Sequence, residues 1–218
     1  MVVMIVLVSL FFFFSIQAIG WALKNRRQEA GATETPIPFS DIHLPKGLFV
    51  DEHHSWARLT ESGELRLGAD EFLTEALGGA DKVELPQPGS EIRRGEALAT
   101  IWRAGRKLAI PSPVNGTVVS ANESIERHPS ALAEDPYGSG WLATVWPVEH
   151  TEALKSLKLG DTAVQWLRSE VQRFTEFLAR QTSPEMVGAT LPDGARPVVG
   201  AALALPEESW EKFQKEFF

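Results

Sequence analysis

The chain contains no cysteine among its 218 residues, and this absence excludes several kinds of site at once. Disulfides, thiolate-bound zinc, cysteine-ligated iron–sulfur clusters and thiol nucleophiles all require a residue that the protein lacks. Histidine is scarce, and no two of the five histidines have the spacing that places two ligands on one helix face. No motif sets a serine and an aspartate beside a histidine either. We therefore expect no metal site and no catalytic residue.

Positive charge is also in short supply. Lysine and arginine number 21 against 29 aspartates and glutamates, which gives a net charge of −8. A general nucleic-acid binder needs a basic surface to neutralise phosphates, so we expect no nucleic-acid partner. The hydrophobic share of 44% and the charged share of 23% are those of an ordinary globular protein, which predicts a folded domain.

What the chain does have is a long apolar run at its amino terminus. No charged residue occurs from Val2 to Leu23, which is long enough to cross a bilayer as a helix. Lys24, Arg26 and Arg27 follow directly, and this basic stop favours a cytoplasmic location for the rest of the chain. A cleaved signal peptide is the alternative, although no basic residue precedes the run. Residues 1–27 are therefore predicted to be a single-pass anchor in the inner or plasma membrane, with the amino terminus outside.

Two segments follow the anchor. Residues 28–47 are polar, contain three prolines and predict a linker. Residues 48–147 carry short alternating apolar runs separated by turn signals, which predict a β-hairpin and five further strands. Between these, the run from Asp70 to Leu77 has helical spacing and stops at Gly78-Gly79. The count and spacing of the strands predict a small β sandwich or flattened barrel.

The remaining residues, 148–218, are predicted to form a helical extension. Helices are expected around Thr151–Leu157, from Asp161 as N-cap to about Gln181, and from Pro206 towards the end of the chain. The second helix has an apolar stripe, which we expect to pack against the β domain. A small hairpin is expected between residues 184 and 204.

The β region contains a series of short motifs, which are His54-Ser55-Trp56, Leu67-Gly68-Ala69-Asp70-Glu71-Phe72, Ala76-Leu77-Gly78, Val83-Glu84-Leu85-Pro86, Gly95-Glu96-Ala97, Ser112-Pro113-Val114-Asn115-Gly116 and Asp135-Pro136-Tyr137-Gly138-Ser139-Gly140-Trp141-Leu142. In their order and spacing these motifs resemble the H protein of the glycine cleavage system. The resemblance implies a lipoyl-domain-like fold, in which two small antiparallel sheets pack face to face and a lysine at an exposed hairpin tip carries lipoate. The fold class expected for the whole chain is mainly β with α: a transmembrane helix, the β sandwich and carboxy-terminal helices.

The lysine that the family pattern requires is absent. In the family it precedes the proline of a Pro-Val-x-Gly motif by eight residues, and counting back from Pro113 leads to Gly105. Lipoate is joined to a lysine amine, so the resemblance implies that this chain has no cofactor. Lys107, two residues further on, is the alternative attachment site, because side chains alternate along a strand. Its basic surroundings depart from the family motif, which is acidic or apolar.

Five basic residues occur close together around this point, and we expect hairpin geometry to bring several of them to one end as a local positive patch. They are Arg93, Arg94, Arg103, Arg106 and Lys107. The patch is open to three interpretations: docking on an acidic partner, attraction to the anionic inner leaflet, or a solvated hairpin end.

These observations predict a membrane-tethered, non-catalytic subunit that uses a degenerate H-like domain as a protein-interaction or scaffold module. Its expected partners are the membrane and other protein subunits of a membrane assembly. Besides the basic residues, the aromatic residues of the extension are candidates for contact with those subunits, namely Trp166, Phe174, Trp210, Phe213 and Phe217. The alternative function is a working lipoyl carrier of the glycine cleavage type, modified at Lys107.

Overall fold

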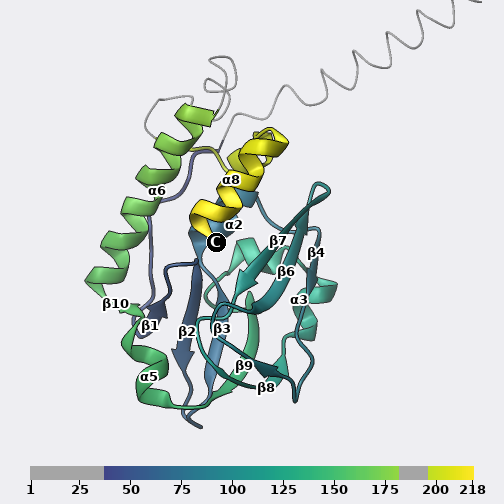
Figure 1. Cartoon of the computed structure of the whole chain (residues 1–218), viewed down its shortest axis with the longest axis vertical. Coiled ribbons are helices and arrows are strands. Elements are labelled where there is room, and N and C mark those ends of the chain that lie inside the picture. Colours follow the sequence, from purple (N-terminus) through teal and green to yellow (C-terminus); the bar gives the residue numbers. More distant parts are fainter. Residues whose placement is uncertain (1–36, 182–195) are drawn as a thin grey trace, which may run out of the picture. The chain divides into compact units, whose positions relative to one another are not determined.

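The computed structural model describes residues 37–181 and 196–218 (Figure 1). The predicted anchor, residues 1–27, and the first part of the predicted linker lie outside the described residues. Across the two described ranges, no helix is both long enough and apolar enough to span a bilayer.

Most of the strands form one antiparallel sheet of seven strands. In order across the sheet they are β10 (Lys158–Leu159), β1 (Leu48–Val50), β2 (Ser55–Leu59), β3 (Leu65–Ala69), β9 (Trp141–Pro147), β8 (Gly116–Ala121) and β5 (Glu91–Ile92). The predicted hairpin corresponds to β2 and β3, whose alternating residues place Ala57 and Leu67 in the core. The short strands β5 and β10 were not predicted, because two residues are too few to show an alternation.

A second sheet of three strands contains β4 (Lys82–Glu84), β6 (Ala97–Arg103) and β7 (Arg106–Pro111). Its apolar residues, such as Ile101 and Leu108, belong to the same core cluster as Leu67 and Val145 of the large sheet. The mainly β, lipoyl-domain-like fold with helices is therefore confirmed for the described residues. Two short helices between β8 and β9 were missed, α3 (Glu123–Arg127) and α4 (Ala131–Glu134).

The helix predicted after the hairpin is α2 (Glu71–Leu77). Asp70 is its N-cap, with a carboxylate oxygen that accepts a hydrogen bond from the Leu73 N–H at 3.0 Å. Gly78 ends the helix in the left-handed conformation with φ of 67°. A side chain there would also meet the backbone of Gly200 at 3.1 Å, so the C-cap requires glycine for two reasons.

The carboxy-terminal region contains α5 (His150–Lys155), α6 (Asp161–Gln181), the 3₁₀ helix η1 (Ala201–Ala204) and α8 (Glu207–Phe217). Asp161 is the first residue of α6 itself, although we expected it to cap the helix. The predicted hairpin between 184 and 204 lies partly outside the described residues. In its described part, residues 197–199 bond to residues 37–39, Gly200 turns the chain with φ of 81°, and the apolar run that follows forms η1 in place of a strand.

The described part of the predicted linker, residues 37–47, packs against the helices. The Phe39 side chain is buried and its ring contacts those of Phe72 on α2 and Phe174 on α6. The Phe39 N–H donates to the Pro197 carbonyl at 2.8 Å. Burying such a side chain contributes roughly 1.5–3 kcal/mol, so this segment is part of the core and does not behave as a free tether.

Candidate functional site

The hairpin of β6 and β7 contains the position where the family pattern expects a lysine. Arg103 pairs with Arg106, and the two residues between them have positive φ, 50° at Ala104 and 79° at Gly105. This is the backbone of a two-residue turn with both central residues in the left-handed region. Gly105 is exposed at the tip, and a side chain built there would meet nothing within 4 Å. The tight turn expected at Gly105 is therefore present.

Asp81, just before β4, holds one side of this tip. Its carboxylate is 2.6 Å from the Arg103 guanidinium and accepts a hydrogen bond from the Ala104 N–H at 2.7 Å. The hydrogen bond from Ala104, together with Arg103, lowers the pKa of the Asp81 carboxyl. The positive charge of Arg103 is therefore paired within the chain.

The other side of the tip is attached to the carboxy-terminal region, and α8 lies between α6 and the hairpin in Figure 1. The Arg106 guanidinium lies 4.7 Å from the centre of the Trp210 ring and donates a hydrogen bond to the Leu205 carbonyl. The Lys107 carbonyl accepts a hydrogen bond from the Gln214 side-chain amide at 2.9 Å. The Lys107 ammonium is 5.4 Å from the centre of the Trp102 ring, and the side chain is exposed.

The hairpin brings three of the five basic residues to one end, as expected, but not all five. Arg103, Arg106 and Lys107 meet at the tip, whereas Arg93 and Arg94 lie at the opposite end of β6, beside Gly95. Arg94 makes an ion pair with the buried Asp51 at 2.6 Å and also bonds Ser156. The seven residues of β6 separate the two groups by about 20 Å.

The aromatic candidates for partner contact are internal, which corrects the prediction made for them. Phe174, Phe213 and Phe217 are at most 1% exposed and Trp210 is 4% exposed, while Trp166 is partly buried against the same core. The apolar faces of α6 and α8 pack against each other within the chain's own core.

A buried polar cluster was missed by the sequence reasoning. His54 is fully buried, with Nδ1 2.8 Å from Asp70 and Nε2 3.5 Å from Glu170, which also bonds Arg173. Burial lowers the pKa of His54, but the Asp70 and Glu170 carboxylates outweigh it and the pKa is raised. Asp70 was recognisable as a helix cap beside a family motif, whereas nothing local links Glu170 to His54. Ring contacts with Phe72 and Trp166 enclose the imidazole.

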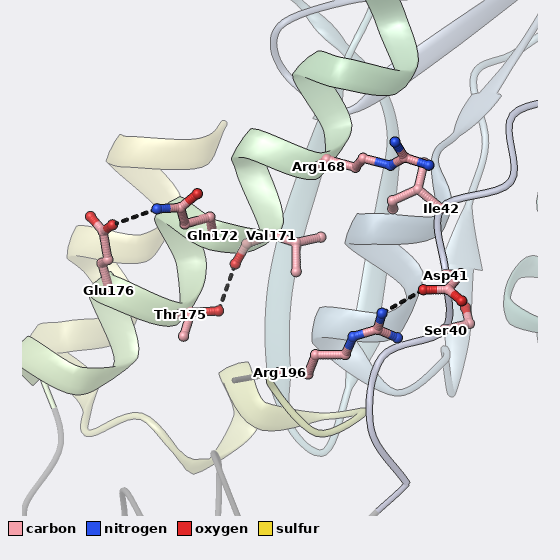
Figure 2. A pocket seen from close by; sticks show the side chains of 9 residues that line it. All are labelled: Ser40, Asp41, Ile42, Arg168, Val171, Gln172, Thr175, Glu176 and Arg196. Atoms are coloured by element: carbon pink, nitrogen blue, oxygen red, sulfur yellow. Dashed lines mark hydrogen bonds and ion pairs between the residues drawn. The ribbon is translucent and has the colours of Figure 1, made fainter. Parts of the chain in front are cut away.

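A hollow of about 540 Å³ lies elsewhere, between residues 40–42, α6 and Arg196 (Figure 2). Figure 2 shows Arg196 directed at Asp41, with which it pairs at 2.5 Å, and Arg168 reaching from α6 towards Ile42. Other polar groups that line it bond within the chain, since the Thr175 hydroxyl donates to the Val171 carbonyl and the Gln172 amide donates to the Glu176 carboxylate. The Ser40 hydroxyl at its edge donates a hydrogen bond to the Glu75 carboxylate of α2, and no histidine is among the described residues that line the hollow.

The family model "Glycine cleavage H-protein" matches residues 48–170. A probable glycine cleavage system H protein from Pyrococcus abyssi is 31% identical over 133 residues, which are 61% of this chain and 98% of that protein. The H protein of Corynebacterium jeikeium is 36% identical over 116 residues, 52% of this chain and 91% of that protein. The crystal structure of an H protein from Mycobacterium marinum superimposes with a TM-score of 0.51 at 27% identity, covering 58% of this chain and 99% of that one. The matched family region ends within α6, so η1 and α8 lie beyond it.

Proposed function

The chain belongs to the glycine cleavage H-protein family, and from this premise we propose that it is a non-catalytic subunit that does not carry lipoate. In this proposal the H-like domain serves as a protein-interaction or scaffold module within a membrane assembly.

The observation that carries the proposal is the hairpin tip. Lipoate attachment needs a primary amine, and the expected position is occupied by Gly105 in a turn whose φ of 79° suits glycine. A lysine there would be strained in that conformation, so the turn and the missing amine are consistent with each other.

The attachment of the hairpin to α8 supports a structural role further. A carrier must present its cofactor to several enzymes from an exposed end. Here Arg106 and Lys107 are tied to residues of the carboxy-terminal region by a cation–π contact and two hydrogen bonds. Such contacts favour a rigid hairpin over a mobile one.

The tether is the second part of the proposal. The uncharged run from Val2 to Leu23 would anchor the chain in the inner or plasma membrane, with the domain on the cytoplasmic side. A fixed location suits a subunit of a membrane assembly, since a freely diffusing carrier gains nothing from immobilisation. The expected partners are therefore other protein subunits.

The alternative is a working lipoyl carrier modified at Lys107. The exposure of Lys107 next to the hairpin tip favours it, because an attaching enzyme could reach the ammonium group. Lipoylation would remove the positive charge that lies over the Trp102 ring, and this contact is worth about 0.5–1 kcal/mol at an exposed site.

Mass spectrometry separates the two functions. The full-length chain is purified from its native membrane in mild detergent, and its intact mass and the peptide covering residues 95–116 are measured. We expect an unmodified peptide and stable companion proteins. Lipoate on Lys107, absent from a Lys107→Arg variant, would establish the carrier function instead. Purification as a lone, unmodified monomer would refute the scaffold role.

A Gly105→Lys variant is the matched positive control for the same measurement. If lipoate attaches to this variant but not to the natural chain, the attaching enzyme was present and active. The lack of modification in the natural chain then follows from the missing amine.

A further inference from the structure

The face of the seven-stranded sheet that points away from the core carries an unusual row of side chains. Arg58 on β2 stands directly opposite Arg66 on β3, and Arg66 stands opposite Thr144 on β9. Because Leu67 and Val145 next to them point into the core, these alternating residues lie on the other face. We call this surface the outer sheet face and define it by Arg58, Arg66, Trp141 and Trp146; Thr144 lies between them but is buried.

The two arginines oppose each other without a compensating carboxylate. Like charges at directly opposed positions of an antiparallel pair are destabilising. In residues 37–181 and 196–218, neither guanidinium makes an ion pair or a hydrogen bond, and the buried Nε of Arg66 has no acceptor. Each is positioned over an aromatic ring, Arg58 at 5.8 Å from Trp56 and Arg66 at 5.1 Å from Trp141. The arginines are thus held in place and remain available to an external acceptor.

Exposed apolar side chains adjoin this row. Trp146 on β9 is 50% exposed, and Val119, in the bulge of β8, is 44% exposed. Arginine and tryptophan are the residue types enriched where protein partners bind most strongly. The aromatic residues of α6 and α8 are buried, and Arg103 at the hairpin tip is paired, so those groups do not compete for this role.

The chemistry of the partner follows from the charges around the row. A guanidinium presents a planar fork of donors that matches a carboxylate. Two glutamates border the face, Glu64 directly before β3 and Glu91 opposite Thr117. They would repel a continuous polyanion such as nucleic acid or an anionic bilayer, but leave room for isolated carboxylates between them.

We propose that the outer sheet face binds an acidic segment of a partner protein, with its carboxylates on Arg58 and Arg66 and an apolar side chain against Trp146. This proposal rests on the scaffold function proposed above and names the surface through which that function acts.

The test uses the full-length chain in a non-ionic detergent and a fluorescently labelled synthetic peptide of alternating glutamate and leucine. A peptide with glutamine in place of glutamate is the matched probe, and binding is followed by fluorescence anisotropy. We expect saturable binding of the acidic peptide alone. Arg58→Glu should weaken it about tenfold or more, whereas Arg127→Glu, the same charge change on α3, should leave it within about twofold.

A second measurement distinguishes a binding role from a structural one. The carboxylate introduced by Arg58→Glu stands opposite Arg66, so the thermal unfolding midpoint of the variant should rise while its peptide binding falls. A fall in both would mean that Arg58 serves folding alone, which overturns the proposal.

Four other results would also overturn it. They are no saturable binding, equal binding by Arg58→Glu, displacement of the peptide by phosphatidylserine but not phosphatidylcholine vesicles, and self-association of the chain that Arg58→Glu abolishes. The last two would identify a membrane surface or a second copy as the occupant. Lipoate found on Lys107 would refute the scaffold function without changing any of these binding results, so the two failures are distinguishable.

Discussion

The half-buried Glu71 in the first turn of α2 allows a quantitative prediction. Its carboxylate accepts a hydrogen bond from the His43 N–H at 2.8 Å. Burial raises the pKa of Glu71 from 4.5 to about 7, and the charges of Asp70 and Glu75 add to this, against the hydrogen bond from His43. The folded state therefore binds the Glu71 proton more tightly than the unfolded state. The resulting stability is fully present below about pH 4.5 and is lost as the pH rises through about 7.

The size of the effect follows from that difference in pKa. Without screening it would correspond to about 3 kcal/mol, and the partial exposure of the side chain reduces this to about 1–2 kcal/mol. The ionised carboxylate at the start of a helix recovers about 0.5 kcal/mol from the helix dipole. Glu71→Gln keeps an oxygen for the His43 N–H and removes the charge. We therefore expect it to raise the free energy of unfolding by about 1 kcal/mol near pH 8 and to have no effect near pH 4.

Urea unfolding monitored by tryptophan fluorescence at both pH values measures this difference. Glu126→Gln, at an exposed position of α3, is the matched control and should change stability at neither pH. His54 contributes a pH dependence of the same sign in every variant, so it cancels in the comparison. A Glu71→Gln variant that is no more stable than the natural chain near pH 8, or is stabilised equally near pH 4, would refute the reasoning.

Three further predictions concern the core, the turn and the buried histidine. Phe213→Ala should lower the free energy of unfolding by about 3–5 kcal/mol in a urea titration, and a loss below about 1 kcal/mol would show that α8 does not share the core. Gly105→Ala should lower the free energy of unfolding by about 1 kcal/mol and speed amide hydrogen exchange at the tip, because φ of 79° disfavours a side chain. Unchanged exchange would contradict the turn geometry. His54→Phe should lower the free energy of unfolding by about 3 kcal/mol near pH 6, since it removes the imidazole that Asp70 and Glu170 share. Because the pKa of His54 is raised in the folded state, its contribution to the free energy of unfolding is present below about pH 6.5 and fades as the pH rises. The same variant should therefore lose less stability near pH 9. An equal loss at both pH values would count against a protonated His54.

Local patterns were sufficient to predict most of the secondary structure. The alternation from Leu65 to Ala69 and the cap pair of Asp70 and Gly78 each involve neighbouring residues, and local sterics and hydrogen bonds decide them. The turn at Gly105 and the missing amine belong to the same class, because one residue type determines both. Two-residue strands such as β5 carry no pattern and were missed.

The amphipathic stripe of α6 shows where local information ends. The spacing of Phe174 and Phe177 reveals an apolar face but does not identify what covers it. We expected the stripe to pack against the β domain and proposed Phe174 as a candidate for partner contact. The structure placed Phe213 and Phe217 of α8 against it. Burial depends on which segments meet, and that is decided by the packing of the whole core.

The sequence by itself determined that this chain is an H-like β domain with helices, lacks cysteine and has glycine where the family pattern requires lysine. Only the tertiary structure decided which charges meet. Arg94 pairs with Asp51 and does not join the basic residues at the hairpin tip. Glu170 pairs with His54, 116 positions earlier in the chain. Arg58 stands opposite Arg66. Such pairings depend on strand register and on the docking of distant helices, which no short stretch of sequence specifies.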